Sequence, residues 1–230
     1  MIKLSILYDK EVKSLFKKFI DNLSNALGLT SNKISEIVKE SNHYITAEEN
    51  VIKDINKTVT ALKSYAETET PSLGEAITSL ANTYEIIETE RKERINKLRE
   101  QFIAPLNGLI TNLKTLQIEQ EEATKAAKEV EKAEKSLKKS QSKPKEKLKP
   151  GEVENAEKAL KAAEQKAKKE EVDVKSATEE FNKTKLETIK KVLHNMVTVE
   201  KTYHEKILTA LSGVKQKAEA IKIEEESKVG

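Results

Sequence analysis

The feature that most limits how this chain can fold is its shortage of residues that interrupt a helix. Its 230 residues include six glycines and four prolines, and only two segments combine them with other turn-forming residues. One segment is centred on Pro71, and the other contains Pro144, Pro150 and Gly151. So few turns exclude a sheet of many short strands, and an all-α fold is expected. The predicted helices cover about residues 9–66, 72–142 and 152–226, with a tip loop at 143–151 between the second and the third.

Apolar residues recur at steps of three and four in each helical range, which is typical of coiled coils. In the first range the series runs through Ile34, Ile37, Ser41, Tyr44, Glu48, Val51, Ile55, Val59 and Leu62, with two polar interruptions. At 1.5 Å per residue the second helix spans roughly 106 Å, whereas a compact domain of this length has a radius of gyration of about 17 Å. We therefore expect residues 1–230 to form a single domain, an elongated antiparallel three-helix coiled coil.

The second helix is expected to be kinked. Pro105 removes a backbone donor and its ring clashes with the preceding turn, which bends a helix. Folding the chain at the turn near residue 69 places Gly28 of the first helix opposite residue 110, close to Gly108. Because residues that weaken a helix meet at one level, we predict a bend that involves Pro105, Gly108 and Gly28.

The apolar face of the second and third helices is broader than one neighbouring helix can cover. Bulky residues gather there, among them Leu186, Leu193 and Val197. A face of this width favours a second bundle that covers it, so a homodimer is expected. The alternative is that these residues complete the core of their own chain. The residues predicted at the dimer interface are Phe102, Leu106, Leu109, Ile189, Val192, Met196 and Tyr203.

Positive charge is concentrated near the tip loop. The whole chain carries +3, but residues 135–149 contain seven lysines and one glutamate, a net charge of +6. A lysine stripe follows one helix face at steps of three and four, and consists of Lys125, Lys128, Lys132, Lys135 and Lys139. Such a concentration indicates a contact surface for an anionic partner. The alternative is a solvated helix face whose lysines are balanced by Glu129, Glu131 and Glu134.

Several functional classes lack the residues that they need. There is no cysteine, which excludes thiol catalysis and zinc sites built on thiolates. His43, His194 and His204 have no metal-site spacing, and no phosphate-binding loop or nucleophile motif occurs, so we expect neither an enzyme nor a bound cofactor or metal. No aromatic residue lies between Phe102 and Phe181, which argues against nucleic-acid binding. No apolar run approaches 18 residues, so we expect a cytoplasmic protein without a membrane span.

The segment from Glu90 to Leu106, which reads ERKERINKLREQFIAPL, resembles the second helix of BAR domains. In that family an aromatic–aliphatic pair and a proline precede a leucine-rich and then charged continuation. The segment from Thr202 to Leu208 is similar to the end of the family's third helix, and the resemblance covers roughly residues 9–222. It implies a crescent-shaped homodimer that binds anionic membranes and senses or induces their curvature, with the tip loop at the ends of the crescent.

The resemblance implies a protein that is peripheral on membranes. It also implies that lipid binds to the basic arm, which is the lysine-rich part of the chain around the tip loop. The lysines expected to contact anionic phospholipid are Lys125, Lys128, Lys132, Lys135, Lys138, Lys139, Lys143, Lys145, Lys147, Lys149, Lys158, Lys161 and Lys168. A basic arm also suits acidic protein surfaces. The alternative is therefore a dimeric coiled-coil scaffold that binds actin or a small GTPase through the same lysines.

Overall fold

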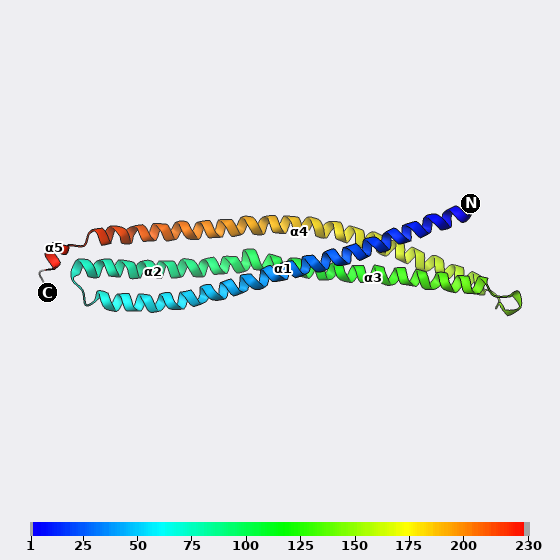
Figure 1. Cartoon of the computed structure of the whole chain (residues 1–230), viewed down its shortest axis with the longest axis horizontal. Coiled ribbons are helices and arrows are strands. Elements are labelled where there is room, and N and C mark those ends of the chain that lie inside the picture. Colours follow the sequence, from blue (N-terminus) through cyan, green and yellow to red (C-terminus); the bar gives the residue numbers. More distant parts are fainter. Residues whose placement is uncertain (1, 228–230) are drawn as a thin grey trace. The chain divides into compact units, whose positions relative to one another are not determined.

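Long helices make up almost all of the computed structural model, which describes the backbone of residues 2–227 and the side chains of residues 18, 20–144, 146–224 and 227. The helices are α1 (Ile2–Ala66), α2 (Pro71–Leu98), α3 (Ala104–Gln141), α4 (Glu152–Glu219) and the short α5 (Ile223–Glu226) (Figure 1). No strand occurs among the described residues. The predicted all-α fold of three long helical stretches is confirmed, because α2 and α3 are joined. Within the described residues, no helix is both long and apolar enough to cross a bilayer.

The first helix begins earlier than the sequence pattern indicates. α1 starts at Ile2 rather than near residue 9 and runs without interruption to Ala66. No glycine or proline precedes Gly28, so nothing in the first turns stops helical hydrogen bonding. The N-terminal segment is therefore continuous with the helix that follows it.

The chain divides into two compact units, and both α1 and α4 contribute to each of them. The first unit comprises Met1–Ser35 and Gly108–Glu187, and the second comprises Glu36–Asn107 and Thr188–Gly230. The first unit therefore combines the start of α1 with α3 and the first half of α4. The second unit combines the rest of α1 with α2 and the second half of α4.

In the first unit, α1 and α4 both pack against α3. Gln120 of α3 is buried, and its Nε2 donates to the backbone oxygen of Ile20 in α1 at 2.9 Å. On the other side Lys166 Nζ of α4 lies 3.0 Å from Glu129 Oε2 of α3. Leu113 of α3 and Val174 of α4 are fully buried in this unit.

In the second unit the core is displaced by one residue from the series expected in α1. Val38, Ile45 and Ile52 face the core, while Ile37, Tyr44 and Val51 are exposed. The buried series still includes the polar position Glu48 and continues to Ile55 and Val59. Two adjacent apolar rows therefore run along α1, and the sequence reading merged them into one.

The interruption of the second long helix is a π-helical turn, Arg99–Ile103. Its closing bond runs from the Ala104 N–H to the Arg99 oxygen, five residues back instead of four. The widened turn lies directly before Pro105, whose ring would otherwise meet the carbonyl of the preceding turn. The predicted kinked second helix is confirmed in this form. α1 is continuous through Gly28, so the roles of Gly28 and Gly108 in a bend stay predictions.

Replacement of Leu113 by Ala should destabilise the chain by about 2–5 kcal/mol, because it removes a fully buried side chain and leaves a cavity. The free energy of unfolding in urea, at fixed protein concentration, measures the change. Leu29→Ala is the matched control, since Leu29 is 67% exposed and its loss should cost less than about 0.5 kcal/mol. Equal losses in the two variants would contradict the described core.

Candidate functional site

One carboxylate holds the tip loop together. Glu152, at the start of α4, accepts hydrogen bonds from Ser140 Oγ at 3.3 Å, from the Lys149 N–H at 3.3 Å and from Lys143 Nζ. Gly151, just before it, has a φ of 75°, a left-handed conformation that favours glycine. The end of α3, the loop and the first turn of α4 are thereby joined at one side chain.

This arrangement changes the electrostatics of the tip loop. The Lys143 ammonium, hydrogen-bonded to Glu152, holds the pKa of that carboxyl below its usual value, and the Lys149 amide lowers the pKa further. Lys143 is itself only partly exposed. Its charge is therefore compensated within the chain, and it contributes less to the external potential than an unpaired lysine would.

Most of the other lysines predicted to bind lipid are exposed to solvent. The exposed ones, all in the first unit, are Lys125, Lys128, Lys132, Lys135, Lys138, Lys139, Lys147, Lys149, Lys158, Lys161 and Lys168. Lys145 begins a short 3-10 turn, and its side chain lies outside the described residues. The structure thus presents the predicted lysines to solvent, on α3, on the tip loop and on α4.

Few of these lysines form an ion pair within 4 Å in the described part of the chain. Lys158 lies 2.7 Å from Glu154, one turn earlier on α4. Among the described side chains, no ion pair within 4 Å involves the lysine stripe. The stripe is therefore a surface whose positive charge is available to an anionic partner.

The lysine stripe also borders a polar groove that the sequence pattern did not indicate. Lys125 and Lys128 line it from α3, together with Thr124, and Ser24 lines it from α1. The buried Gln120 forms its floor and holds the two helices at this level. In the sequence, the signal for this groove was a glutamine inside an otherwise apolar series. Its hydrogen-bond partner could not be read from the sequence, because it is a backbone oxygen on a distant helix segment.

Three carboxylates come together on the same unit. One oxygen each from Glu119 and Glu122 of α3 and Glu170 of α4 lies within 4.8 Å of the others. Exposed acidic groups commonly occur together without a bound ion. We assign no ligand to them.

Four of the residues predicted at a dimer interface are instead buried within their own chain. Leu106, Leu109, Val192 and Tyr203 expose 1, 1, 2 and 6% of their surface. Side chains already covered by their own helices offer little area to a partner, and the interface role of these four stays a prediction. Phe102 and Ile189 are half-buried and Met196 is exposed, and for these three it stays a prediction.

Other apolar residues of the second unit are exposed, and they form two rows. The α1 row consists of Ile37, Tyr44 and Val51, which are 46, 45 and 42% exposed. The α4 row consists of Leu193, Val197, Leu208 and Leu211, which are 57, 68, 66 and 43% exposed. Apolar residues that recur every seven positions, as in the α1 row, form the seam that a further helix covers in a coiled coil.

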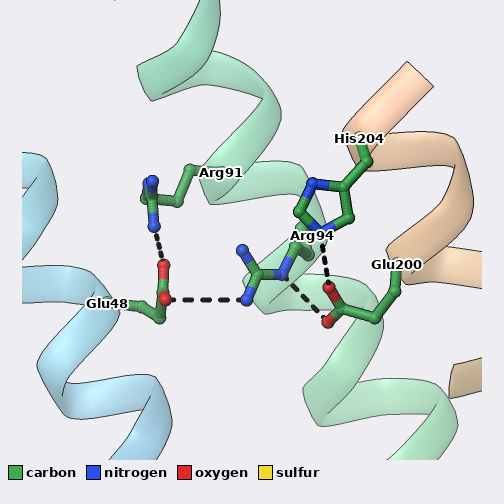
Figure 2. A network of polar contacts seen from close by, with 5 residues as sticks. All are labelled: Glu48, Arg91, Arg94, Glu200 and His204. Atoms are coloured by element: carbon green, nitrogen blue, oxygen red, sulfur yellow. Dashed lines mark hydrogen bonds and ion pairs between the residues drawn. The ribbon is translucent and has the colours of Figure 1, made fainter. Parts of the chain in front are cut away.

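A network of ions connects the three helices of this unit (Figure 2). Glu48 of α1 pairs with Arg91 of α2 and lies 3.6 Å from Arg94 of the same helix. Arg94 Nε lies 3.1 Å from Glu200 of α4, and His204 Nε2 lies 3.8 Å from the other oxygen of Glu200. Two guanidinium groups thus face two carboxylates, and Arg94 is 5% exposed.

Aromatic rings enclose the same arginines. The Arg94 guanidinium lies 4.6 Å from the ring centre of Tyr203 and 5.4 Å from that of Tyr44, and Arg91 lies 5.7 Å from Tyr203. Cation–π contacts add to the ion pairs when the cation is removed from water. The buried Arg91 Nε has no hydrogen-bond partner within the described chain. Arg94 of α2 therefore contacts both α1 and α4 and connects the three helices.

The pKa of Glu152 should rise toward its ordinary value in Lys143→Met, because that substitution removes the main cause of the lowering. A carboxyl with a lowered pKa contributes stability above its unfolded pKa, and that contribution is lost as the pH falls through the folded pKa. An NMR titration of the Glu152 side chain measures the shift. Lys147→Met, which changes the same charge in the loop, should leave it unchanged. An unchanged Glu152 titration in Lys143→Met would contradict the described tip contacts.

Comparison with solved structures places the fold. The chain is similar to the BAR domain of Drosophila amphiphysin, with a TM-score of 0.70 and 17% sequence identity, over 88% of this chain and 93% of that chain. The N-terminal I-BAR domain of D. discoideum IBARa aligns over 95% of this chain and 96% of that one, with 16% identity and a TM-score of 0.49. No curated protein matches the chain. The similarity to amphiphysin confirms the BAR fold that the sequence predicted.

A family model gives the closer assignment. The model described as FAM92 protein matches residues 2–228, which is nearly the whole chain. The match includes both units and the tip loop between α3 and α4. The chain belongs to the FAM92 protein family.

Proposed function

We propose that this chain is a BAR-type domain that forms a crescent homodimer, binds anionic membranes through its basic arms, and senses or induces curvature there. The observation that carries the proposal is the exposed, largely uncompensated set of lysines around the tip loop. It is supported by the BAR fold. On this view the protein is cytoplasmic and peripheral on membranes, and it needs no cofactor.

The charge distribution is adequate for the proposed role. Near an anionic leaflet each lysine contributes on the order of 1 kcal/mol, within about one Debye length of the surface. The net charge of +6 in residues 135–149 therefore supplies several such contributions per arm. Two arms on one dimer would act together, because the second contact becomes intramolecular.

A second copy of the chain is the proposed occupant of the exposed apolar rows in the second unit. The α1 and α4 rows have coiled-coil spacing, and a two-fold dimer lets the same face serve on both copies. Covering these rows removes apolar surface from water, which favours association by roughly 25 cal/mol per Å² of apolar surface buried. Because α1 and α4 each run through both units, we further propose that residues 1–230 act as one domain.

Replacement of Lys143, Lys145, Lys147 and Lys149 by Glu should weaken binding to phosphatidylserine vesicles by about tenfold or more. Vesicle co-sedimentation measures the binding, which should also weaken with added salt and be absent on pure phosphatidylcholine. The matched control replaces Lys39, Lys53, Lys57 and Lys201, exposed lysines of the second unit, by Glu. The net charge changes equally, so the control separates a tip contact from general attraction.

The same experiment decides between membrane and protein partners. Vesicle binding that ignores the four tip substitutions would overturn the tip assignment. Co-sedimentation with actin filaments, or capture by a small GTPase, in the absence of vesicle binding would favour the scaffold alternative. The basic arm would then recognise an acidic protein surface.

Replacement of both Leu193 and Val197 by Glu should convert the dimer to a monomer, because it would bury two charges in the proposed interface. Sedimentation equilibrium separates the 25.9 kDa chain from a dimer. The control variant replaces Ile118 and Val172 of the first unit, each 59% exposed, by Glu, and this variant should stay dimeric. A native chain that is monomeric at tens of micromolar would rule out the homodimer.

A further inference from the structure

The ion network of the second unit adjoins the apolar rows proposed to meet a second copy. Tyr44, which stacks on Arg94, is a member of the α1 row. On α4, Glu200 follows Leu193 by seven residues, and His204 follows Val197 by seven residues. Residues seven apart lie on one face of a helix, so these polar groups continue the α4 row. A second copy that covers both rows also covers the network.

The network is built so that it can be covered. Its two carboxylates and two guanidinium groups compensate one another within the chain, and Glu48, Arg91 and Glu200 expose 13, 17 and 28% of their side chains. Covering a compensated network costs much less than covering an isolated charge. A buried network nevertheless contributes little more to stability than apolar residues of the same volume would. We therefore look for a role of the network in this face other than strengthening the dimer.

The apolar rows by themselves define the position of a partner poorly. In the α1 row equivalent side chains recur every seven residues, so a partner displaced by seven residues, about 10 Å, meets similar surface. The network occurs once along this face. A displaced partner would place leucine or isoleucine over Glu200 and His204 and leave their hydrogen-bonding groups without water.

We propose that the network of Glu48, Arg91, Arg94 and Glu200 is the element that selects one register of self-association. Arg94 acts as a positioning residue, because it fixes the Tyr44 ring and the Glu200 carboxylate on two different helices. The partner that this arrangement selects is a second copy of the chain. It is held in the one register in which polar groups of that copy lie over the network. The inference rests on the proposed homodimer.

The test measures distances between two copies of the full-length chain. The chain has no cysteine, so Lys57→Cys, at a position 79% exposed on α1, takes a single spin label. Pulsed electron paramagnetic resonance on the native background should give one narrow distance between labels. The variant Glu48→Met, Arg94→Met and Glu200→Met should keep its helical circular dichroism and stay dimeric, but add at least one further distance population.

A matched control separates the network from surface charge in general. Lys206 of α4 pairs with Glu90 at 2.7 Å and Glu93 at 3.4 Å of α2, outside the exposed rows. Replacing these three residues by Met also removes one cation and two carboxylates, here from α2 and α4. This variant should keep the single native distance.

Each result has one meaning. If the native chain shows no distance between copies, the homodimer itself fails. If the native chain and the network variant show the same single distance, or if the network variant becomes monomeric, the register proposal fails while the homodimer stands. If the triple variant does not fold, Arg94→Lys decides. It keeps the charge but loses the planar fork that reaches two carboxylates, so it should also add a second distance.

Discussion

Each long helix of this protein has to bury a narrow stripe along its whole length, and the rest of the structure depends on that requirement. α1 and α4 contain 65 and 68 residues, and a helix of this kind is stabilised mainly by packing of its apolar face. The buried row of α1 passes through Val38, Ile45 and Ile52. Any polar residue that falls in such a row needs partners on the neighbouring helices.

Glu48 is such a residue, and its partners explain much of the second unit. It occupies a position between Ile45 and Ile52, where an aliphatic side chain would fit the pattern. Arg91 and Arg94 of α2 compensate its charge, and Arg94 extends the connection to Glu200 of α4. A single polar interruption in one helix is thereby converted into a contact among three.

The two units handle charge in different ways. In the second unit, the network compensates its ions locally and surrounds them with Tyr44 and Tyr203. In the first unit, the lysine stripe has no ion pair with the described side chains, and only the base of the tip loop is closed by Glu152. Compensated charges suit a face that another copy covers, and uncompensated charges suit a face that meets an anionic surface.

The sequence by itself determined the elements of this protein. Scarce glycine and proline set the helical stretches, Pro105 marked the interruption of the second one, and the lysine spacing located the basic arm. Only the tertiary structure decided which apolar row of α1 faces inward, since Ile37 and Val38 are equally apolar and one residue apart. It also showed that Leu106, Leu109, Val192 and Tyr203 are buried within their own chain, and it brought Arg94 to Glu200, 106 residues away. Periodicity is a local property of one helix, whereas burial and ion pairing depend on which faces of three helices meet.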